Sequence, residues 1–280
     1  MGTEGFVWIG LAIAGMAFLA EYVDSTLGMG YGTTLTPILL LMGYDPFQVV
    51  PAVLFSELVT GLLAGAAHHS AGNANFALKS ANPGGILQSF KKGAYVRTIR
   101  NTLPRHLKIV LLIASCSILG SLVAVLVAVN ISKFWLKTYI GLMVLGVGVL
   151  TIATAKRKIR FSWPKIAGLS VLASFNKAMT GGGYGPIVCA GQLVCGVESR
   201  SAVAITSFAE GLTCAVAFSM LYLIRGITDW TLFPWLVVGA TLSVPLSVYT
   251  VKRVNASKLR FAIGVFAALL GVFTLIKTLA

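Results

Sequence analysis

Three charged residues stand inside apolar stretches of this sequence, where they could bind an anion or exchange protons. They are Lys177, Glu57 and Glu210. An ionisable side chain in a membrane segment is costly, so its presence suggests a function. Lys177 could provide the counter-charge for an anion, or it could pair with Asp24 and hold the surrounding segments together. Glu57 and Glu210 could carry protons with the anion, or they could accept N–H bonds from interrupted backbone beside them. The sequence leaves these alternatives open.

Two glycine-rich stretches are expected to interrupt the membrane helices. We expect the interruptions over residues 24–32 and 177–185, because glycine allows sharp turns and close approach of a ligand to the backbone. Each is followed by an apolar segment too short to cross a bilayer alone, Tyr31–Met42 and Pro186–Cys195. Such a segment would form a half-membrane helix. Its first N–H groups and partial positive charge would favour an anion.

The candidate substrate-binding residues lie in and beside these two stretches. They are Gly28, Gly30, Tyr31, Gly32 and Thr33 in the first, and Asn176, Lys177, Gly181, Gly183, Tyr184 and Gly185 in the second. The glycines could instead serve only to pack helices closely. The two tyrosines could line or gate the site, or they could belong to a packed interior.

The other reactive side chains give weaker signals. Four cysteines lie in apolar runs, without the Cys-x-x-Cys spacing of a metal or redox site. Cys189 adjoins the second glycine-rich stretch, and it is either a small buried apolar residue or a sulfur-handling group. His68 and His69 end an apolar run, where we expect interfacial residues, with a route for protons as the alternative. We expect no metal and no cofactor.

The composition indicates a membrane protein built from helices. Hydrophobic residues make up 57% of the chain and charged residues 11%, against about 25% charged in soluble domains. The long apolar runs lack the alternation of barrel strands. They are Phe6–Tyr22, Phe47–Ala67, Leu107–Val129, Phe134–Ala155, Ile166–Phe175, Ser201–Ile224, Leu232–Val251 and Leu259–Leu279. No basic residue precedes the first run, so we expect a retained helix rather than a signal peptide.

The basic residues lie between the apolar runs, which argues against a nucleic-acid partner. The formal net charge is +14, and it is concentrated in residues 68–106, 156–165 and 252–260, which contain no acid. The positive-inside rule puts these stretches in the cytoplasm. The loops at 131–133 and 225–230 would then be external, as would both termini.

The two halves of the chain repeat each other. A shift of 153 residues aligns the run Gly28–Gly32 with Gly181–Gly185 and Glu57 with Glu210, and a later shift of 125 implies 28 additional residues in the first half. Each half contains five elements, so the halves should be inverted. The sequence therefore predicts an all-α polytopic membrane protein of two inverted five-element repeats, each with one short half-membrane helix after a glycine-rich break. The expected parts are a first repeat over 1–155 with a basic cytoplasmic insertion at about 79–105, a cytoplasmic linker over 156–165, and a second repeat over 166–280.

The glycine motifs resemble those of the TauE/SafE sulfite exporter family, also described as the toluene-sulfonate uptake permease family. The resemblance rests on residues 24–32 followed by Pro37, on residues 180–186, and on the turns at 72–76 and 226–230. Met29 departs from it, since glycine is common there, and so does the basic insertion. The resemblance implies a bacterial inner-membrane protein whose partners are the lipid bilayer and a small sulfur oxyanion or organosulfonate. A homodimer is left open.

Taken together, these expectations predict a transporter rather than an enzyme. The leading hypothesis is a secondary transporter that exports sulfite or a small organosulfonate by alternating access, with the anion bound near the midplane between two helix N-termini. The alternatives are an anion channel and a sulfur-compound uptake permease that uses a membrane cysteine. No nucleotide-binding loop indicates direct coupling to ATP.

Overall fold

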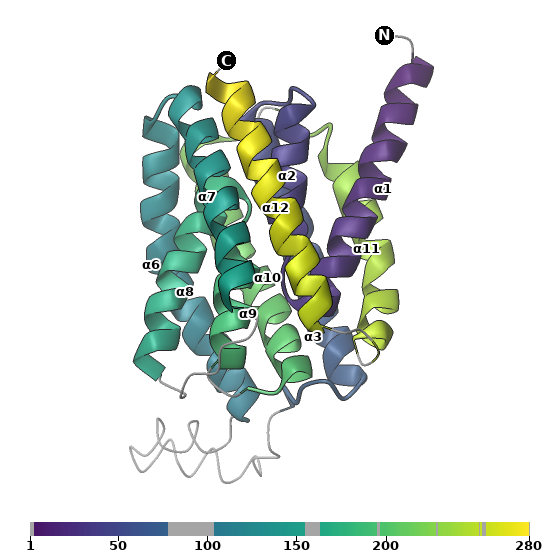
Figure 1. Cartoon of the computed structure of the whole chain (residues 1–280), viewed down its shortest axis with the longest axis vertical. Helices are drawn as coiled ribbons and strands as arrows, with labels where there is room; N and C mark the ends of the chain where they lie inside the picture. Colours follow the sequence, from purple (N-terminus) through teal and green to yellow (C-terminus); the bar gives the residue numbers. More distant parts are fainter. Residues whose placement is uncertain are drawn as a thin grey trace.

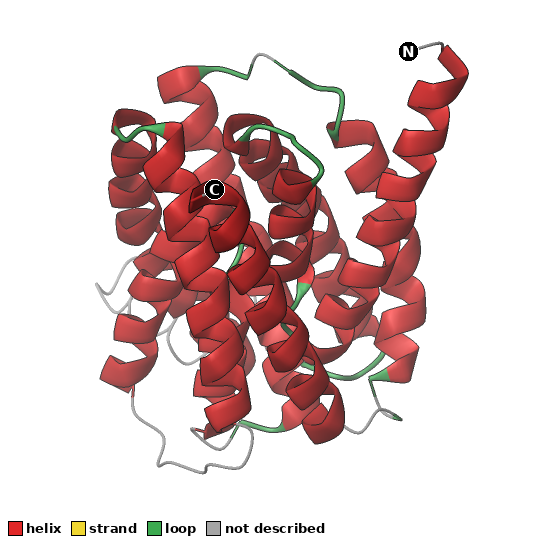
Figure 2. Cartoon of the chain, turned by 45° about the horizontal axis from the view of Figure 1, so that its top comes forward, coloured by secondary structure: helices red, strands yellow, loops and turns green. Residues whose placement is uncertain are grey.

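The structure is a bundle of helices. It is a computed structural model that describes residues 3–77, 104–154, 163–194, 197–227, 229–251, 253 and 256–279. Within these residues all regular secondary structure is helical (Figures 1 and 2). The helices are α1 (Thr3–Leu27), α2 (Tyr31–Leu41), α3 (Pro46–Ser70), α6 (Arg105–Asn130), α7 (Lys133–Thr154), α8 (Trp163–Thr180), α9 (Tyr184–Val194), α10 (Ser199–Arg225), α11 (Phe233–Thr250) and α12 (Ala256–Leu279).

The helices have the lengths and surfaces of membrane-spanning segments. Six of the described helices, α1, α3, α6, α7, α10 and α11, are long and apolar enough to cross a membrane. Large apolar side chains on the outside of the bundle are exposed, which in a soluble monomer would be unusual. Examples are Leu142, Leu172, Leu223, Leu242 and Phe273. The prediction of an all-α protein with many apolar helices is confirmed.

The two short helices follow the two glycine-rich breaks. Helices α2 and α9 have 11 residues each, or about 16 Å at 1.5 Å per residue, which is half of a bilayer core. Each packs against the long helix before it, α1 or α8. The chain therefore enters the bundle as a long helix and turns inside the protein.

The breaks are narrower than the sequence indicated. Helix α1 continues through Leu27 and α8 through Thr180, so the expected interruptions at 24–32 and 177–185 were too wide. The polar residues near the end of α1 fit a helix because their hydroxyls bond within it. Ser25 donates to Glu21 at 2.6 Å, and Thr26 donates to the Tyr22 carbonyl at 2.6 Å.

Helices α3 and α10 pack against each other in the interior and position the central carboxylates. Their contact is close because glycine faces glycine: a Cβ added to Gly61 would lie 2.7 Å from the Gly211 Cα. Around this pair, α1 packs on α11, α6 on α8, and α7 on α12. Since small residues let helix backbones approach in membranes, the α3–α10 contact brings Glu57 and Glu210 to the same level.

Both termini lie at one end of the bundle (Figure 1). The helix ends that flank the three basic stretches lie at the opposite end, namely those at Ser70, Arg105, Thr154, Trp163, Thr250 and Ala256. The expected insertion at 79–105 lies almost wholly outside the described residues, as does most of the expected linker at 156–165.

Candidate functional site

The two glycine-rich breaks lie in direct contact inside the bundle. Gly28 and Gly181 end α1 and α8 with φ angles of 71° and 72°, in the left-handed region that glycine adopts at little cost. Gly30 and Gly183 also have positive φ, at 140° and 77°. Glycines at equivalent positions of the two repeats therefore have the same kind of backbone conformation, with positive φ.

The crossing of the two breaks requires two further glycines. A Cβ added to Gly32 would collide with the carbonyl of Gly181 and lie 2.8 Å from the Gly182 Cα. A Cβ added to Gly185 would lie 2.6 Å from the Cα of Met29. Such distances leave no room for a side chain, so Gly32 and Gly185 are required by backbone contact and not by a turn.

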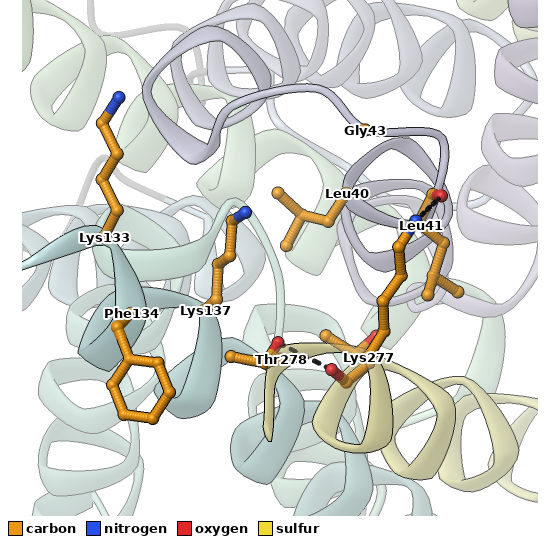
Figure 3. Close-up of a pocket in the computed structure, with 9 residues that line it drawn as sticks. Leu40, Leu41, Gly43, Lys133, Phe134, Lys137, Lys277 and Thr278 are labelled. Atoms are coloured by element: carbon orange, nitrogen blue, oxygen red, sulfur yellow. Dashed lines mark hydrogen bonds between the residues drawn. The ribbon is translucent and has the colours of Figure 1, made fainter. Parts of the chain in front are cut away.

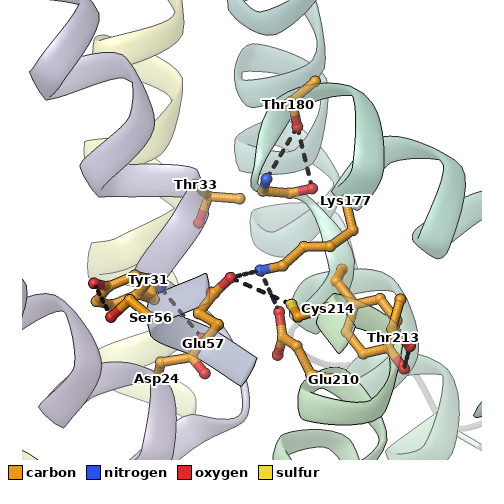
Figure 4. Close-up of polar contacts among 12 residues, drawn as sticks. Asp24, Tyr31, Thr33, Ser56, Glu57, Lys177, Thr180, Glu210, Thr213 and Cys214 are labelled. Atoms are coloured by element: carbon orange, nitrogen blue, oxygen red, sulfur yellow. Dashed lines mark hydrogen bonds and ion pairs between the residues drawn. The ribbon is translucent and has the colours of Figure 1, made fainter. Parts of the chain in front are cut away.

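Lys177 is buried between two carboxylates at this crossing. It lies in the last turn of α8 and is 1% exposed, while Glu57 on α3 and Glu210 on α10 are 3% and 4% exposed. The Lys177 Nζ forms an ion pair with Glu57 Oε2 and another with Glu210 Oε1 at 2.7 Å. Figure 4 shows the lysine reaching between the two acids. We call these three residues the triad.

The triad corrects two interpretations drawn from the sequence. Lys177 does not pair directly with Asp24, whose Oδ1 instead accepts the backbone N–H of Tyr31 at 3.2 Å and so caps α2. The glutamates accept no bond from the described backbone, because one oxygen of each is paired with Lys177 and the other has no hydrogen-bond partner among the described residues. Asp24 and Lys177 are equivalent in the repeat, so only the first short helix has an acid at its start.

The two tyrosines belong to a packed interior. Tyr31 and Tyr184 are both fully buried. The Tyr31 hydroxyl shares a hydrogen bond with Ser56 on α3 at 2.8 Å. The Tyr184 hydroxyl accepts from Thr213 on α10 at 3.2 Å. Each ring therefore fixes the start of its short helix to the long helix that carries a triad glutamate.

Thr33 and Asn176, the neutral candidates beside the crossing, and the nearby Thr180 all form hydrogen bonds within the protein. Thr33 donates to the Gly30 carbonyl at 3.1 Å. The Thr180 hydroxyl accepts the Gly182 N–H at 3.0 Å, and the Asn176 side-chain oxygen accepts the Tyr139 hydroxyl at 2.5 Å.

Several polar groups around the crossing were missed or misplaced by the sequence analysis. His68 is fully buried among the helices, and its Nε2 lies 3.1 Å from the Ser25 carbonyl oxygen. Glu21, on α1, accepts the Ser25 hydroxyl one helical turn away. The spacing of four residues between Glu21 and Ser25 could have indicated this bond.

Some of the buried polar atoms with no hydrogen-bond partner among the described residues belong to the triad itself. They are the second carboxylate oxygens of Glu57 and Glu210. Buried polar groups are usually satisfied in native proteins. The unmet bonding capacity therefore marks this region as one that can take up a proton or a polar ligand.

A separate cavity of about 320 Å³ lies at the end of the bundle that holds both termini. Three lysines line it, Lys133 and Lys137 from α7 and Lys277 from α12 (Figure 3). Lys133 is bonded to Asp45 at 2.6 Å, and Lys277 donates to the Leu41 carbonyl at 2.5 Å. The sequence analysis did not group these residues, because they lie far apart in the chain.

The described cysteines have the environments of packing residues. Cys189 is buried, and its thiol donates to the Leu27 carbonyl at 3.2 Å. Cys214 is buried with its Sγ 3.8 Å from Glu57 Oε2. Cys116 is half-buried, and Cys195 lies outside the described residues.

Comparison with known proteins identifies the class to which this arrangement belongs. The sequence matches the family model described as "Sulfite exporter TauE/SafE" over residues 13–98 and 91–274. The chain belongs to the TauE/SafE family. A relative of this TauE/SafE protein is the "Probable membrane transporter protein YtnM" of Bacillus subtilis (strain 168), with 24% identity over 282 residues that cover 95% of this chain and 83% of the relative. No solved structure matches the chain.

The family assignment confirms the resemblance inferred from the glycine motifs. Together with the six candidate spans it makes this TauE/SafE protein a multi-pass membrane transporter. The family and the relative are described as transporters and not as enzymes.

Proposed function

We propose that this TauE/SafE protein is a secondary transporter that exports sulfite or a small organosulfonate by alternating access. The anion would bind near the midplane, where α2 and α9 begin. The observation that carries the proposal is the direct contact of the two glycine-rich breaks beside the buried Lys177. A half-length helix presents free N–H groups and a partial positive charge at its start, and two such starts meet here.

The two halves of the chain are proposed to be inverted repeats, with boundaries at 1–155, 156–165 and 166–280. The pattern of helix packing supports this. Helix α1 packs on α11 as its counterpart α8 packs on α6, while α3 packs on its counterpart α10 and α7 on its counterpart α12. Pairs related in this way are expected from a two-fold relation in the membrane plane. A transporter of this kind moves by exchanging the conformations of its two halves.

The N-terminal ends of α2 and α9 would make unequal contributions to the anion site. Asp24 already accepts from the first turn of α2, whereas no described side chain accepts from the first turn of α9. The start of α9 and Lys177 are thus the more favourable side for a negative charge. The oxygens of sulfite or a sulfonate would replace water there by accepting backbone N–H bonds.

The distribution of the basic residues supports a proposed orientation. The basic stretches flank helix ends at the end of the bundle opposite the termini, so we place that end in the cytoplasm and both termini outside. An inside-negative membrane potential then favours movement of any species that crosses with net negative charge toward the end that holds the termini. The three-lysine cavity lies at that end and would receive the departing anion.

Counterflow in proteoliposomes tests the proposal. The purified full chain is reconstituted with unlabelled sulfite or sulfoacetate inside, and uptake of the same labelled anion is measured. A transporter should show saturable uptake that internal substrate accelerates, relative to protein-free liposomes. Uptake that rises linearly without saturation would identify a channel instead, and no uptake of either anion would contradict the proposed substrate class.

A cysteine-dependent permease is tested in the same preparation. The buried Cys189, bonded to a backbone carbonyl, is expected to be a packing residue. Cys189→Ser should therefore retain saturable counterflow. Complete loss of transport in a folded Cys189→Ser protein, with a covalent sulfur adduct on the wild-type thiol, would favour the alternative.

A further inference from the structure

The buried centre of this protein contains more acids than bases. Four carboxylates lie within it, from Glu21 and Asp24 on α1, Glu57 on α3 and Glu210 on α10. Lys177 is the one buried lysine among the described residues. The titratable groups that face the triad from each packed element are Glu21 and Asp24 of α1, Tyr31 of α2, Tyr184 of α9 and Cys214 of α10. An anion site at this place is therefore surrounded by negative charge when all the acids are ionised.

Lys177 already forms ion pairs with two carboxylates in the structure. Two of its three N–H donors are directed to Glu57 and Glu210. An oxyanion that approached Lys177 would meet two carboxylates at hydrogen-bond distance from the same nitrogen. Like charges at such distances repel strongly in a low-dielectric interior. Lys177 cannot serve as counter-charge for an anion while both glutamates are ionised.

We propose that the Glu57–Lys177–Glu210 triad couples transport of the anion to a proton that moves in the same direction, so that the protein is a proton–anion symporter; this rests on the transport activity proposed above. A proton from water on the side where the anion enters binds one triad carboxylate and breaks its ion pair with Lys177. The released Lys177 N–H then binds the oxyanion. When the anion leaves on the other side, the carboxyl group gives its proton to water there and pairs with Lys177 again.

The geometry provides a place for this proton. One oxygen of each triad glutamate is bonded to Lys177, and the other, Glu57 Oε1 or Glu210 Oε2, is buried with no partner among the described residues. Protonation of such a carboxyl group needs no other hydrogen bond to be broken. The proton removes the negative charge of one carboxylate, and one anionic group of the ligand takes its place beside Lys177, so the lysine is paired in both states.

The triad also connects the two halves of the chain. Lys177 and Glu210 belong to the second half, and Glu57 belongs to the first. Glu57 and Glu210 occupy equivalent positions on α3 and α10, which pack directly on each other. A rearrangement of one half against the other must alter the Lys177–Glu57 ion pair. Exchange of a carboxylate for an anion at Lys177 can therefore be linked to the conformational change.

The test measures how far a pH gradient across the membrane drives accumulation of a labelled anion inside proteoliposomes. Full-length protein is reconstituted in proteoliposomes with the membrane potential clamped at zero by potassium and valinomycin. The probe is labelled sulfoacetate, which stays ionised between about pH 6 and 8 because a carboxyl group titrates near pH 4; sulfite titrates in this range and would carry protons itself. Symport of one proton per anion predicts about tenfold accumulation per pH unit, toward the alkaline side.

Two variants and a matched control assign the coupling to the triad. Glu57→Gln and Glu210→Gln each replace a carboxylate by a neutral group of the same shape. The variant that lacks the proton-binding carboxylate should show measurable counterflow at an altered rate with an accumulation ratio near one, and the other variant should still respond to the gradient. Glu198→Gln makes the same chemical change at the exposed start of α10, and it should accumulate sulfoacetate like the wild type. Folding is checked by size-exclusion chromatography.

Each outcome decides the proposal. Counterflow of wild-type protein without any response to the pH gradient would overturn proton coupling and leave the transporter assignment intact. Accumulation of sulfoacetate in response to the gradient by both glutamine variants would remove the triad from the coupling mechanism. Absence of counterflow for both sulfite and sulfoacetate would refute the proposed function itself, and the coupling with it. The wild-type measurement decides even where a variant fails to fold.

Discussion

Gly32 at the start of α2 lies against the backbone carbonyl of Gly181 at the end of α8, and no side chain fits between them. The two residues are far apart in sequence, and each belongs to one of the two matched glycine motifs. Their contact brings the two short helices together where they begin. The proposed anion site therefore depends on two backbones crossing without side chains.

Gly32→Ala tests this crossing. The added methyl group would overlap the Gly181 carbonyl and lie 2.8 Å from the Gly182 Cα, so the breaks must separate. Overpacking of a buried contact typically costs about 1–3 kcal/mol, and backbone overlap lies at the upper end. We expect a lower thermal midpoint in detergent and loss of anion counterflow.

Gly15→Ala is the matched control for Gly32→Ala. Gly15 lies within α1, and a Cβ there would have no atom within 4 Å. Alanine has the higher helix propensity, so this variant should keep or slightly raise the thermal midpoint and keep transport. Equal loss of transport in both variants would contradict a specific role for the crossing.

Lys177→Ala is expected to destabilise the protein as well as stop transport. It would leave Glu57 and Glu210 buried with no cation. Breaking a buried pair by removing one partner costs about 3–5 kcal/mol. A Lys177 that served only as counter-charge for the anion would give a Lys177→Ala protein that folds but does not transport sulfite. The triad instead predicts a much lower thermal midpoint for this variant.

Neutralising the acids should restore the fold without restoring transport. In the triple variant Lys177→Met, Glu57→Gln and Glu210→Gln, no unpaired charge of the triad remains. We expect a thermal midpoint well above that of Lys177→Ala, and no counterflow in either protein. If the triple variant transported sulfite at the wild-type rate, Lys177 would have no role as counter-charge.

The fold was largely predictable because the membrane restricts the choice of structures. Backbone groups in a bilayer must bond internally, so long apolar runs become helices. The two short runs after the glycines could be recognised by length alone, as α2 and α9. The positive φ of Gly28 and Gly181 fits their placement at the breaks. Repetition of the motif told us which glycines would have equivalent roles.

The pairing of the central charges could not be predicted in the same way. The sequence showed that Lys177, Glu57 and Glu210 are embedded, but not the relative heights of α3, α8 and α10. Those heights follow from side-chain packing, including the Gly61–Gly211 contact. The wide interruptions were a related error, since Ser and Thr near a helix end can bond to the preceding turn and extend the helix.

Tyr31→Phe and Tyr184→Phe distinguish packing residues from gating residues. Both rings are fully buried. The Tyr31 hydroxyl is hydrogen-bonded with Ser56 on α3, and the Tyr184 hydroxyl accepts from Thr213 on α10. Removing the hydroxyl while keeping the ring should cost about 1 kcal/mol. We expect a slightly lower thermal midpoint and retained counterflow in both variants. A large change in transport rate without a change in stability would assign a gating role to the tyrosine concerned.

At the end of the bundle that holds the termini, the hydrogen bonds of Asp229 should stabilise the folded protein by an amount that depends on pH. The hydroxyl and N–H of Thr231 donate to its Oδ1 at 2.6 and 2.8 Å, and the Gln48 side chain donates to its Oδ2 at 2.6 Å. These hydrogen bonds favour the ionised carboxylate and lower the pKa of Asp229 from its usual value, and the bonds from Thr231 have the largest effect. The loop between α10 and α11 is thereby tied to the first turn of α3.

A lowered pKa in the folded state fixes the sign of the effect. The stabilisation is fully present above the unfolded-state pKa of about 3.9 and is lost as the pH falls through the lower folded-state pKa. Wild-type protein should therefore unfold at a higher temperature than Asp229→Asn at pH 7, and the difference should shrink below about pH 4. We expect it to correspond to less than about 1 kcal/mol, because solvent screens this half-exposed group. Thermal unfolding followed by tryptophan fluorescence at pH 7, 5, 4 and 3 measures the trend, and a difference that grows on acidification would contradict the assigned bonds.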